Sequence, residues 1–198
     1  MRHDLELTGH AFRLRPVELS DAAFIVELRA RAGAFLNPGA STVADQIAWL
    51  QAYFERSGDF CFVVERADRT RAEGLVGIYG IDEDRHTAEW GRWVLRPGSS
   101  AAVESALLVY RCAFERLALQ HLRCCTLADN VKVVAFHDSS GLVRAPAPVT
   151  IEHGGRQVPG VLHTLARRDW ESVRRRLEPL AARVASAVSR GASRLAPS

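Results

Sequence analysis

The stretch best suited to binding a ligand is a small-residue turn between an apolar strand, residues 88–95, and an amphipathic helix. The turn reads RPGSS at residues 96–100, and no bulky side chain shields the first backbone N–H groups of the helix. Unpaired N–H groups and the positive end of the helix dipole together attract anions. This chemistry predicts a phosphate seat, although a plain strand-to-helix connection explains the same residues equally well.

The four cysteines do not predict a metal site. Cys61, Cys112, Cys124 and Cys125 contain no C-x-x-C pair, and the two adjacent ones lie in a predicted strand, where they point to opposite faces. Zinc needs a denser pattern of ligands. We therefore expect buried free thiols and no metal.

Short strands and amphipathic helices surround the turn. Apolar residues recur at steps of three and four after it, which predicts a helix that reaches Leu117. In chain order we expect strands at 5–8 and 11–17, helices at 21–32 and 43–56, and a meander of strands at 60–66, 75–81 and 88–95. After the central helix we expect a strand at 121–127, a helix at 131–138, a hairpin of 149–153 and 157–165, and a helix at 169–188 bent near Pro179.

Composition and charge argue for one soluble domain. The chain has 198 residues and a formal net charge of +3, and it lacks the basic, aromatic-interleaved stripe that binds nucleic acid. It contains no apolar run long enough to cross a bilayer, and its start, MRHDLELTGH, does not read as a signal peptide. We expect a cytoplasmic protein with one domain over residues 1–188 and a disordered tail over 189–198.

Residues 88–117 resemble the GCN5-related N-acetyltransferases, the GNAT superfamily, in its ribosomal-protein and amino-sugar acetyltransferase branch. The core strand of that branch commonly reads A-E-apolar-G-aromatic-aromatic, and here it reads AEWGRW. Its helix commonly carries A-x-E-A and then A-F-E, and here these are AVES and AFE. The order of elements over residues 5–175 also matches. The resemblance implies an α+β (mixed α/β) fold whose mostly antiparallel sheet splays around an acetyl-CoA cleft.

The resemblance also implies an activity, the transfer of an acetyl group from acetyl-CoA to a primary amine by direct attack in a ternary complex. The phrase FLN at residues 35–37, followed by QIAWL at 46–50, is similar to members that modify nucleotide-linked amino sugars. A protein N-terminus is the alternative acceptor. A non-catalytic CoA-binding module is a further alternative, because Pro97 and Ser100 depart from the family's loop. A homodimer stays open.

For the cofactor, the resemblance implies the backbone of the strand before the turn, the turn itself, and an Asn after the next strand. That Asn is also a good helix N-cap, and Phe136 also suits a core position. The residues expected at the cofactor are Trp93, Val94, Leu95, Arg96, Gly98, Ser99, Ser100, Ala101, Ala102, Val103, Asn130 and Phe136.

His137 and Glu89 are the catalytic candidates that the resemblance implies. Many family members carry a Tyr seven residues after the Asn, placed to protonate the leaving CoA thiolate, and His137 stands seven residues after Asn130. A solvated histidine at a helix end is the alternative. Glu89 lies on the strand beside the expected thioester, where a carboxylate would take the ammonium proton through water. The alternative for Glu89 is a structural pair with Arg92 or Arg123.

The acceptor amine is expected to bind between the first two helices and the final hairpin. The candidate residues there are Phe35, Asn37, Trp49 and Tyr53. Aromatic residues on a helix are also common in a core, so a structural role for the last two stays open.

Overall fold

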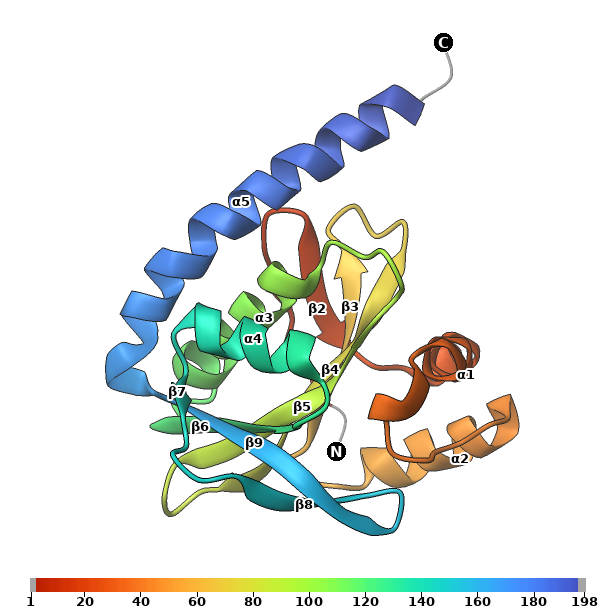
Figure 1. Cartoon of the computed structure of the whole chain (residues 1–198). Coiled ribbons are helices and arrows are strands. Elements are labelled where there is room, and N and C mark those ends of the chain that lie inside the picture. The colour runs from red at the N-terminus through yellow and green to blue at the C-terminus, as the bar shows by residue number, and fades with distance from the viewer. Residues whose placement is uncertain (1–2, 196–198) are drawn as a thin grey trace.

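The protein, described here from a computed structural model that covers residues 3–195, is built on one mixed sheet flanked by helices (Figure 1). Neighbouring strands follow the order β1-β2-β3-β4-β5-β6-β9-β7, and β8 pairs with β9. The strands are β1 (Leu7–Thr8), β2 (Phe12–Pro16), β3 (Phe60–Arg66), β4 (Ala72–Asp82), β5 (Thr87–Leu95), β6 (His121–Leu127), β7 (Val143–Arg144), β8 (Val149–His153) and β9 (Arg156–Ala166). The helices are α1 (Ala22–Arg31), α2 (Val43–Phe54), α3 (Ala102–Arg111), α4 (Val131–Ser140) and α5 (Trp170–Leu195).

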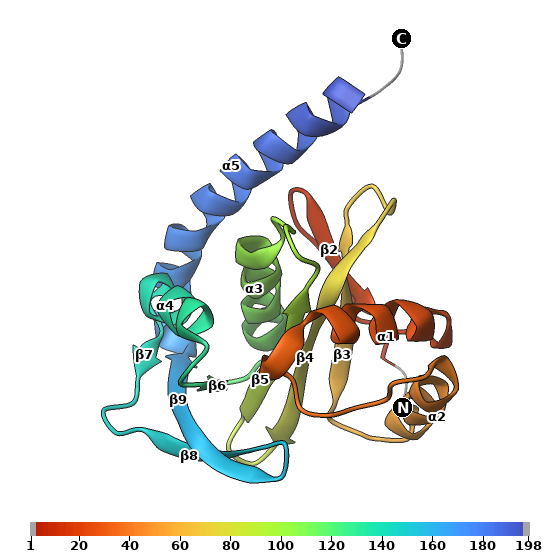
Figure 2. The same cartoon turned by 45° about the vertical axis from the view of Figure 1, so that its right-hand side comes forward.

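Alternation along the strands divides the core into two apolar layers, one on each face of the sheet. Phe62 and Val64 of β3 pack with α3 and α5, whereas Cys61 and Val63 pack with α1 and α2. Figure 2 shows α1 and α2 on one side of the strands and α3 with α5 on the other. The expected α+β fold with a mostly antiparallel sheet is confirmed, because β5 with β6 is the only parallel pair of strands within residues 3–195.

The parallel pair β5 and β6 is short, and this opens the sheet. The two strands are in register from Thr87 with His121 to Glu89 with Arg123. Beyond that point β5 follows β4 as far as Leu95, while β6 follows β9 as far as Leu127. The two strands therefore diverge from Glu89 onward.

A bulge in β5 lies within the diverging part. Gly91 pairs with Gly77 and Val94 pairs with Leu75, so that two β5 residues oppose Val76 alone. The first of these, Arg92, has φ +51, which is rare for a residue with a side chain. An extra residue of this kind bends a strand and changes the direction of its side chains.

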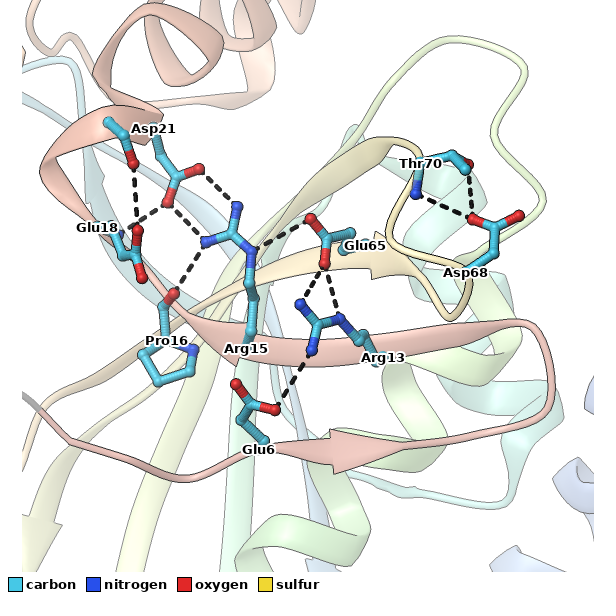
Figure 3. Close-up of polar contacts among 10 residues, drawn as sticks. Glu6, Arg13, Arg15, Pro16, Glu18, Asp21, Glu65, Asp68 and Thr70 are labelled. Carbon is cyan, nitrogen blue, oxygen red and sulfur yellow. Dashed lines mark hydrogen bonds and ion pairs between the residues drawn. The ribbon is translucent and has the colours of Figure 1, made fainter.

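An ion-pair network joins β2, β3 and the start of α1 (Figure 3). Arg13 donates to Glu65 at 2.7 Å, and Arg15 donates to both oxygens of Asp21 at 2.7 and 2.8 Å. Arg15 Nε also reaches Glu65 at 3.3 Å. The Asp21 carboxylate raises the pKa of the Arg15 guanidinium. Because Asp21 immediately precedes α1, the network fixes where this helix begins on the sheet.

Some element boundaries differ from those expected. β4 begins at Ala72, within the expected turn, because Glu73 is buried and its carbonyl accepts from the N–H of Arg96. Helix α5 runs through Pro179 to Leu195, so the backbone stays helical beyond residue 189, where we expected a disordered tail. Residues 196–198 of that tail lie outside the described part of the chain. No helix within residues 3–195 is long and apolar enough to span a membrane.

Candidate active site

A cleft of about 540 Å³ opens where β5 and β6 diverge. Residues 90–94 of β5 and 124–127 of β6 form two of its sides, and residues from α4 also line it. The α1–α2 loop, residues 35–40, and residues 151–153 of β8 complete the lining. The cleft therefore brings the predicted cofactor side and the predicted acceptor side into one space.

The strand edges inside the cleft suit an extended ligand that carries amide groups. Among the described residues, β5 and β6 share no pairing beyond Glu89 and Arg123. The backbone groups on those edges need partners, since buried N–H and C=O groups are nearly always satisfied. An amide chain lying between the edges would pair with them as an added strand.

Glu89 sits at the fork where the two strands separate. Its carboxylate accepts a hydrogen bond from the Tyr79 hydroxyl at 3.0 Å and pairs with Arg123 Nε at 3.3 Å. Burial and the adjacent carboxylate raise the pKa of Tyr79, so the phenol stays protonated and donates. Of the two arginines considered as structural partners of Glu89, Arg123 forms the ion pair, whereas Arg92 binds Asp59.

His137 lies inside the cleft rather than in solvent. It is only 2 % exposed, its ring meets Trp90 edge-on at 5.3 Å, and its Nδ1 has no hydrogen-bond partner among the described residues. Burial, with the neighbouring His163, lowers its pKa to about 4. The solvated alternative is therefore wrong, and at neutral pH the proton that His137 offers is the N–H of a neutral ring.

The structure separates the predicted cofactor residues into two groups. Trp93, Val94 and Asn130 line the cleft, and the Asn130 side chain also accepts from the N–H of Val133 at 3.5 Å as the N-cap of α4. Phe136 does not line it but packs against Trp93, with ring centroids 5.1 Å apart. The position of Asn130 is thus compatible with both of its expected roles, contact with the cofactor and N-cap of α4. Phe136 packs behind a residue that lines the cleft.

The turn between β5 and α3 lies beyond the cleft's lining. The remaining predicted residues there are Leu95, Arg96, Gly98, Ser99, Ser100, Ala101, Ala102 and Val103. Gly98 has φ +77, and the N–H of Ala101, the N-cap residue of α3, donates to Ser99 Oγ at 3.3 Å. No side chain caps the N–H groups of the first turn of α3 itself, which leaves those of Ala102 and Val103 to an anion. Arg96 is engaged elsewhere, because it donates to the Ala72 carbonyl at 3.0 Å and to Glu27 at 3.3 Å.

The structure also separates the residues expected to bind the acceptor into those that line the cleft and one that does not. Phe35, Asn37 and Trp49 line the cleft, and Phe35 is 47 % exposed. Tyr53 does not line it, because it is buried beneath Trp49 and its hydroxyl bonds with Asp59 O at 3.1 Å and Cys61 N at 2.8 Å. The structural role left open for Tyr53 is therefore the one that its contacts support.

Asn37 also ties the two acceptor elements together. Its Oδ1 accepts from the N–H of Gly154 at 3.0 Å, so the α1–α2 loop meets the β8–β9 turn. This contact joins segments 117 residues apart in the sequence.

The cysteines are free, and three of them line the cleft, Cys61, Cys124 and Cys125. Burial raises the pKa of Cys61 and Cys112 to about 12, and it also raises that of Cys124 and Cys125. All four therefore stay protonated at neutral pH. Within residues 3–195 no group of three His, Cys, Asp or Glu side chains is placed to hold a metal ion.

Several cleft residues were not among the sequence candidates, and two of them, Tyr79 and Arg29, have polar side chains that bear on function. Tyr79 lies directly across from Glu89 in the β4–β5 register, so the meander pattern would have found it once the register was known. Arg29 could not be predicted as a site residue from the sequence, because a single arginine near the end of a helix is common on protein surfaces.

Comparisons with known proteins identify the family and the fold. The sequence model of the Acetyltransferase (GNAT) domain matches residues 12–143, about two thirds of the chain. A search of curated proteins found no match.

Three solved structures illustrate the similarity of fold. Apo FdhC, described as a nucleotide-linked sugar GNAT, is 24 % identical, covers 89 % of this chain and 99 % of its own, and has a TM-score of 0.73. A putative acetyltransferase from T. thermophilus is 21 % identical, with coverages of 88 % and 95 % and a TM-score of 0.74. A mutant of the spermidine N-acetyltransferase SpeG from Vibrio cholerae is 18 % identical, with coverages of 82 % and 97 % and a TM-score of 0.70.

Proposed function

The chain belongs to the GNAT acetyltransferase family, and from this premise we propose that it acetylates the primary amine of a nucleotide-linked amino sugar. The amine would attack acetyl-CoA directly, with both substrates bound together. The observation that carries the proposal is the cleft, in which two unpaired strand edges meet the α1–α2 loop and the β8–β9 hairpin. The sugar acceptor is supported by the likeness to a solved nucleotide-linked sugar GNAT.

We propose that residues of the cleft and of the turn beside it bind the parts of acetyl-CoA, which supplies an acyl group activated as a thioester. The backbone edges at Trp93 and Val94 would bind the amides of its pantetheine arm. The uncapped N–H groups at the start of α3, at Ala102 and Val103, would bind its pyrophosphate. Asn130, which lines the cleft at the start of α4, would contact the arm from the β6 side.

Glu89 is the group that we propose takes the proton from the acceptor ammonium, through water. Tyr79 and Arg123 hold two sides of its carboxylate, so the orientation of the remaining lone pairs is fixed. A base fixed in this way contributes to rate mainly through position. An amine must be neutral to attack, so this proton transfer precedes the reaction.

His137 is the group that we propose stabilises the leaving sulfur. Its pKa of about 4 leaves roughly one ring in a thousand charged at pH 7, so an imidazolium is a poor source of the proton. A neutral imidazole N–H still donates a hydrogen bond to a developing negative charge, in a site that excludes water. The edge-on packing of Trp90 fixes the ring for that task.

Thermal unfolding tests cofactor binding first, and CoA release then tests transfer. Acetyl-CoA at about a hundred times its Kd should stabilise the fold by about 2.7 kcal/mol, whereas NADH and ATP should not do so at the same concentration. Release of free CoA would then be measured with a nucleotide-linked amino sugar, spermidine and a short peptide with a free N-terminus. Turnover of the peptide alone would replace the sugar with a protein acceptor, and binding without any turnover would favour a non-catalytic module.

The free thiols also suit a reducing compartment, so we propose that the protein works in the cytoplasm.

A further inference from the structure

Arg29 of α1 places a cation at the acceptor end of the cleft. It lines the cleft together with the α1–α2 loop, and its Nη2 donates to the carbonyl of Asn37 at 2.5 Å. The guanidinium lies against the backbone of Gly39, where a Cβ would come within 3 Å of it. The loop therefore folds around this side chain and holds it in one position.

The guanidinium has no carboxylate partner among the described residues, unlike three other half-buried arginines. Arg92 pairs with Asp59 at 2.5 Å, Arg96 with Glu27 at 3.3 Å, and Arg15 with Asp21 at 2.7 Å. Burial alone accounts for the lowered pKa of Arg29, and no acidic group acts against it. An unpaired half-buried charge costs stability, so its presence calls for an explanation.

The acidic groups of the cleft do not neutralise Arg29. Glu89 is held by Arg123 at 3.3 Å, and Glu152 is exposed on β8 and forms no ion pair with Arg29. Phe35, an exposed aromatic residue on the loop that contacts Arg29, lines the same end of the cleft. This end therefore offers a fixed cation and an exposed ring.

We propose that Arg29 binds an anionic group of the acceptor, a phosphoryl group or a carboxylate, and so selects acceptors that carry both an amine and an anion. The inference rests on the proposed acetyl transfer and adds to it the residue that recognises the acceptor. A guanidinium suits this task, because its N–H groups match two oxygens of a carboxylate or phosphate at once. The exposed ring of Phe35 would stack on the base or sugar of a nucleotide-linked acceptor.

The same cation disfavours acceptors that carry only positive charge. A polyamine or a basic peptide would bring its charges toward Arg29 without an anion to compensate, and like charges at close range cost several kcal/mol in an interface. Among amines, the order of preference should therefore follow the presence of an anionic group.

The kinetic test uses one set of acceptors that differ only in the anion. The amino sugar is supplied free, as its 1-phosphate and as its nucleoside-diphosphate derivative, and butylamine is compared with 4-aminobutyrate for the carboxylate. Arg29→Gln should lower kcat/KM for the preferred anionic acceptor by about 10- to 100-fold, mainly through KM, because a charged hydrogen bond is lost. Arg29→Lys should retain part of the preference, and the uncharged amines should be unaffected.

Arg31→Gln is the matched control, because Arg31 lies on the same helix, is 60 % exposed and pairs with Glu27 outside the cleft. Equal losses for anionic and uncharged acceptors, or the same loss in the Arg31 variant, would overturn the inference. Thermal unfolding without ligand shows whether each variant folds.

A binding measurement separates this inference from the proposed activity. With CoA present at saturation, titration of UDP and of 4-aminobutyrate should show at least one that binds the parent protein and binds Arg29→Gln about tenfold or more weakly. CoA affinity should be the same in both proteins. If no amine is acetylated but this difference holds, the proposed function fails and the anion site stands. If neither anion depends on Arg29, the anion site is wrong even where acetyl transfer is found.

Discussion

The guanidinium of Arg92 donates two hydrogen bonds to the carboxylate of Asp59, at 2.5 and 2.8 Å. Arg92 is the bulge residue of β5 with φ +51, and its guanidinium also lies 4.5 Å from the centre of the Tyr79 ring. The pair therefore fixes a residue whose backbone conformation is unfavourable by itself. Arg92 lines the cleft, whereas Asp59 does not. Since the bulge sets the path of Trp93 and Val94 along the cleft, this ion pair helps to determine the shape of one of its walls.

Asp59→Asn should destabilise the protein by about 1–3 kcal/mol and raise the KM for acetyl-CoA. The change leaves the Arg92 guanidinium, which is 31 % exposed, without its charged partner, so the cost is less than for a fully buried pair. Urea unfolding and steady-state kinetics measure the two effects. Asp68→Asn is the control, because Asp68 is exposed and does not line the cleft. Equal costs for the two variants would contradict the role given to Asp59.

Gly74→Ala should destabilise the fold by about 1–3 kcal/mol and remove the stabilisation by acetyl-CoA. Gly74 faces Leu95 across β4 and β5, and an added Cβ would overlap the carbonyl oxygen of Val94. The backbone must then shift where the cofactor is expected to bind. Gly80→Ala is the control, because a Cβ there meets open space and only the φ of +61 opposes it, at about 1 kcal/mol. If acetyl-CoA still stabilises the Gly74→Ala variant, Val94 is not part of the cofactor-binding site.

Local patterns were enough to predict most of the elements. The strand at 121–127 was predicted with the bounds that β6 has, because its alternation and its flanking turns are clear. The start of α4 after Asn130 follows from a local N-cap, and the β8–β9 hairpin follows from Gly154 and Gly155, both at positive φ. In each case the decisive residues are close in sequence.

The cleft itself depends on contacts between distant residues, which a sequence pattern does not show. The Arg92 bulge is visible only in the register of β4 against β5, and the burial of His137 on α4 depends on Trp90 of β5 and His163 of β9. Arg29 acquires its position only because the loop after α1 folds back over it. The family resemblance predicted which segments would form the candidate site. How the charged side chains within it are paired is visible only in the structure.

Glu89→Gln should lower kcat by about 10²- to 10⁴-fold and leave the KM for acetyl-CoA within about twofold of the parent value. The amide keeps the hydrogen bond from Tyr79 but accepts no proton, so positioning is retained and basicity is lost. Tyr79→Phe, which removes only the donor, should cost far less. Measurements at pH 9, where more of the amine is already neutral, should recover part of the Glu89→Gln loss. An unchanged kcat at neutral pH would show that the amine arrives without help from this carboxylate.

His137 should make the protein less stable as the pH falls from 7 toward 4. Burial lowers the pKa of its imidazole from 6.5 to about 4, so the unfolded chain takes up a proton in this window and the folded chain does not. The contribution of His137 to stability is complete above pH 6.5 and is lost as the pH falls through the pKa of the folded state, with a loss of about 3 kcal/mol at most. His3, whose pKa is also lowered by burial, acts in the same direction. His137→Phe should therefore reduce the slope of unfolding free energy against pH without removing it. Urea unfolding at half-unit intervals of pH measures the slopes of the parent and the variant, and identical slopes would mean that His137 is protonated as readily in the folded chain as in the unfolded one.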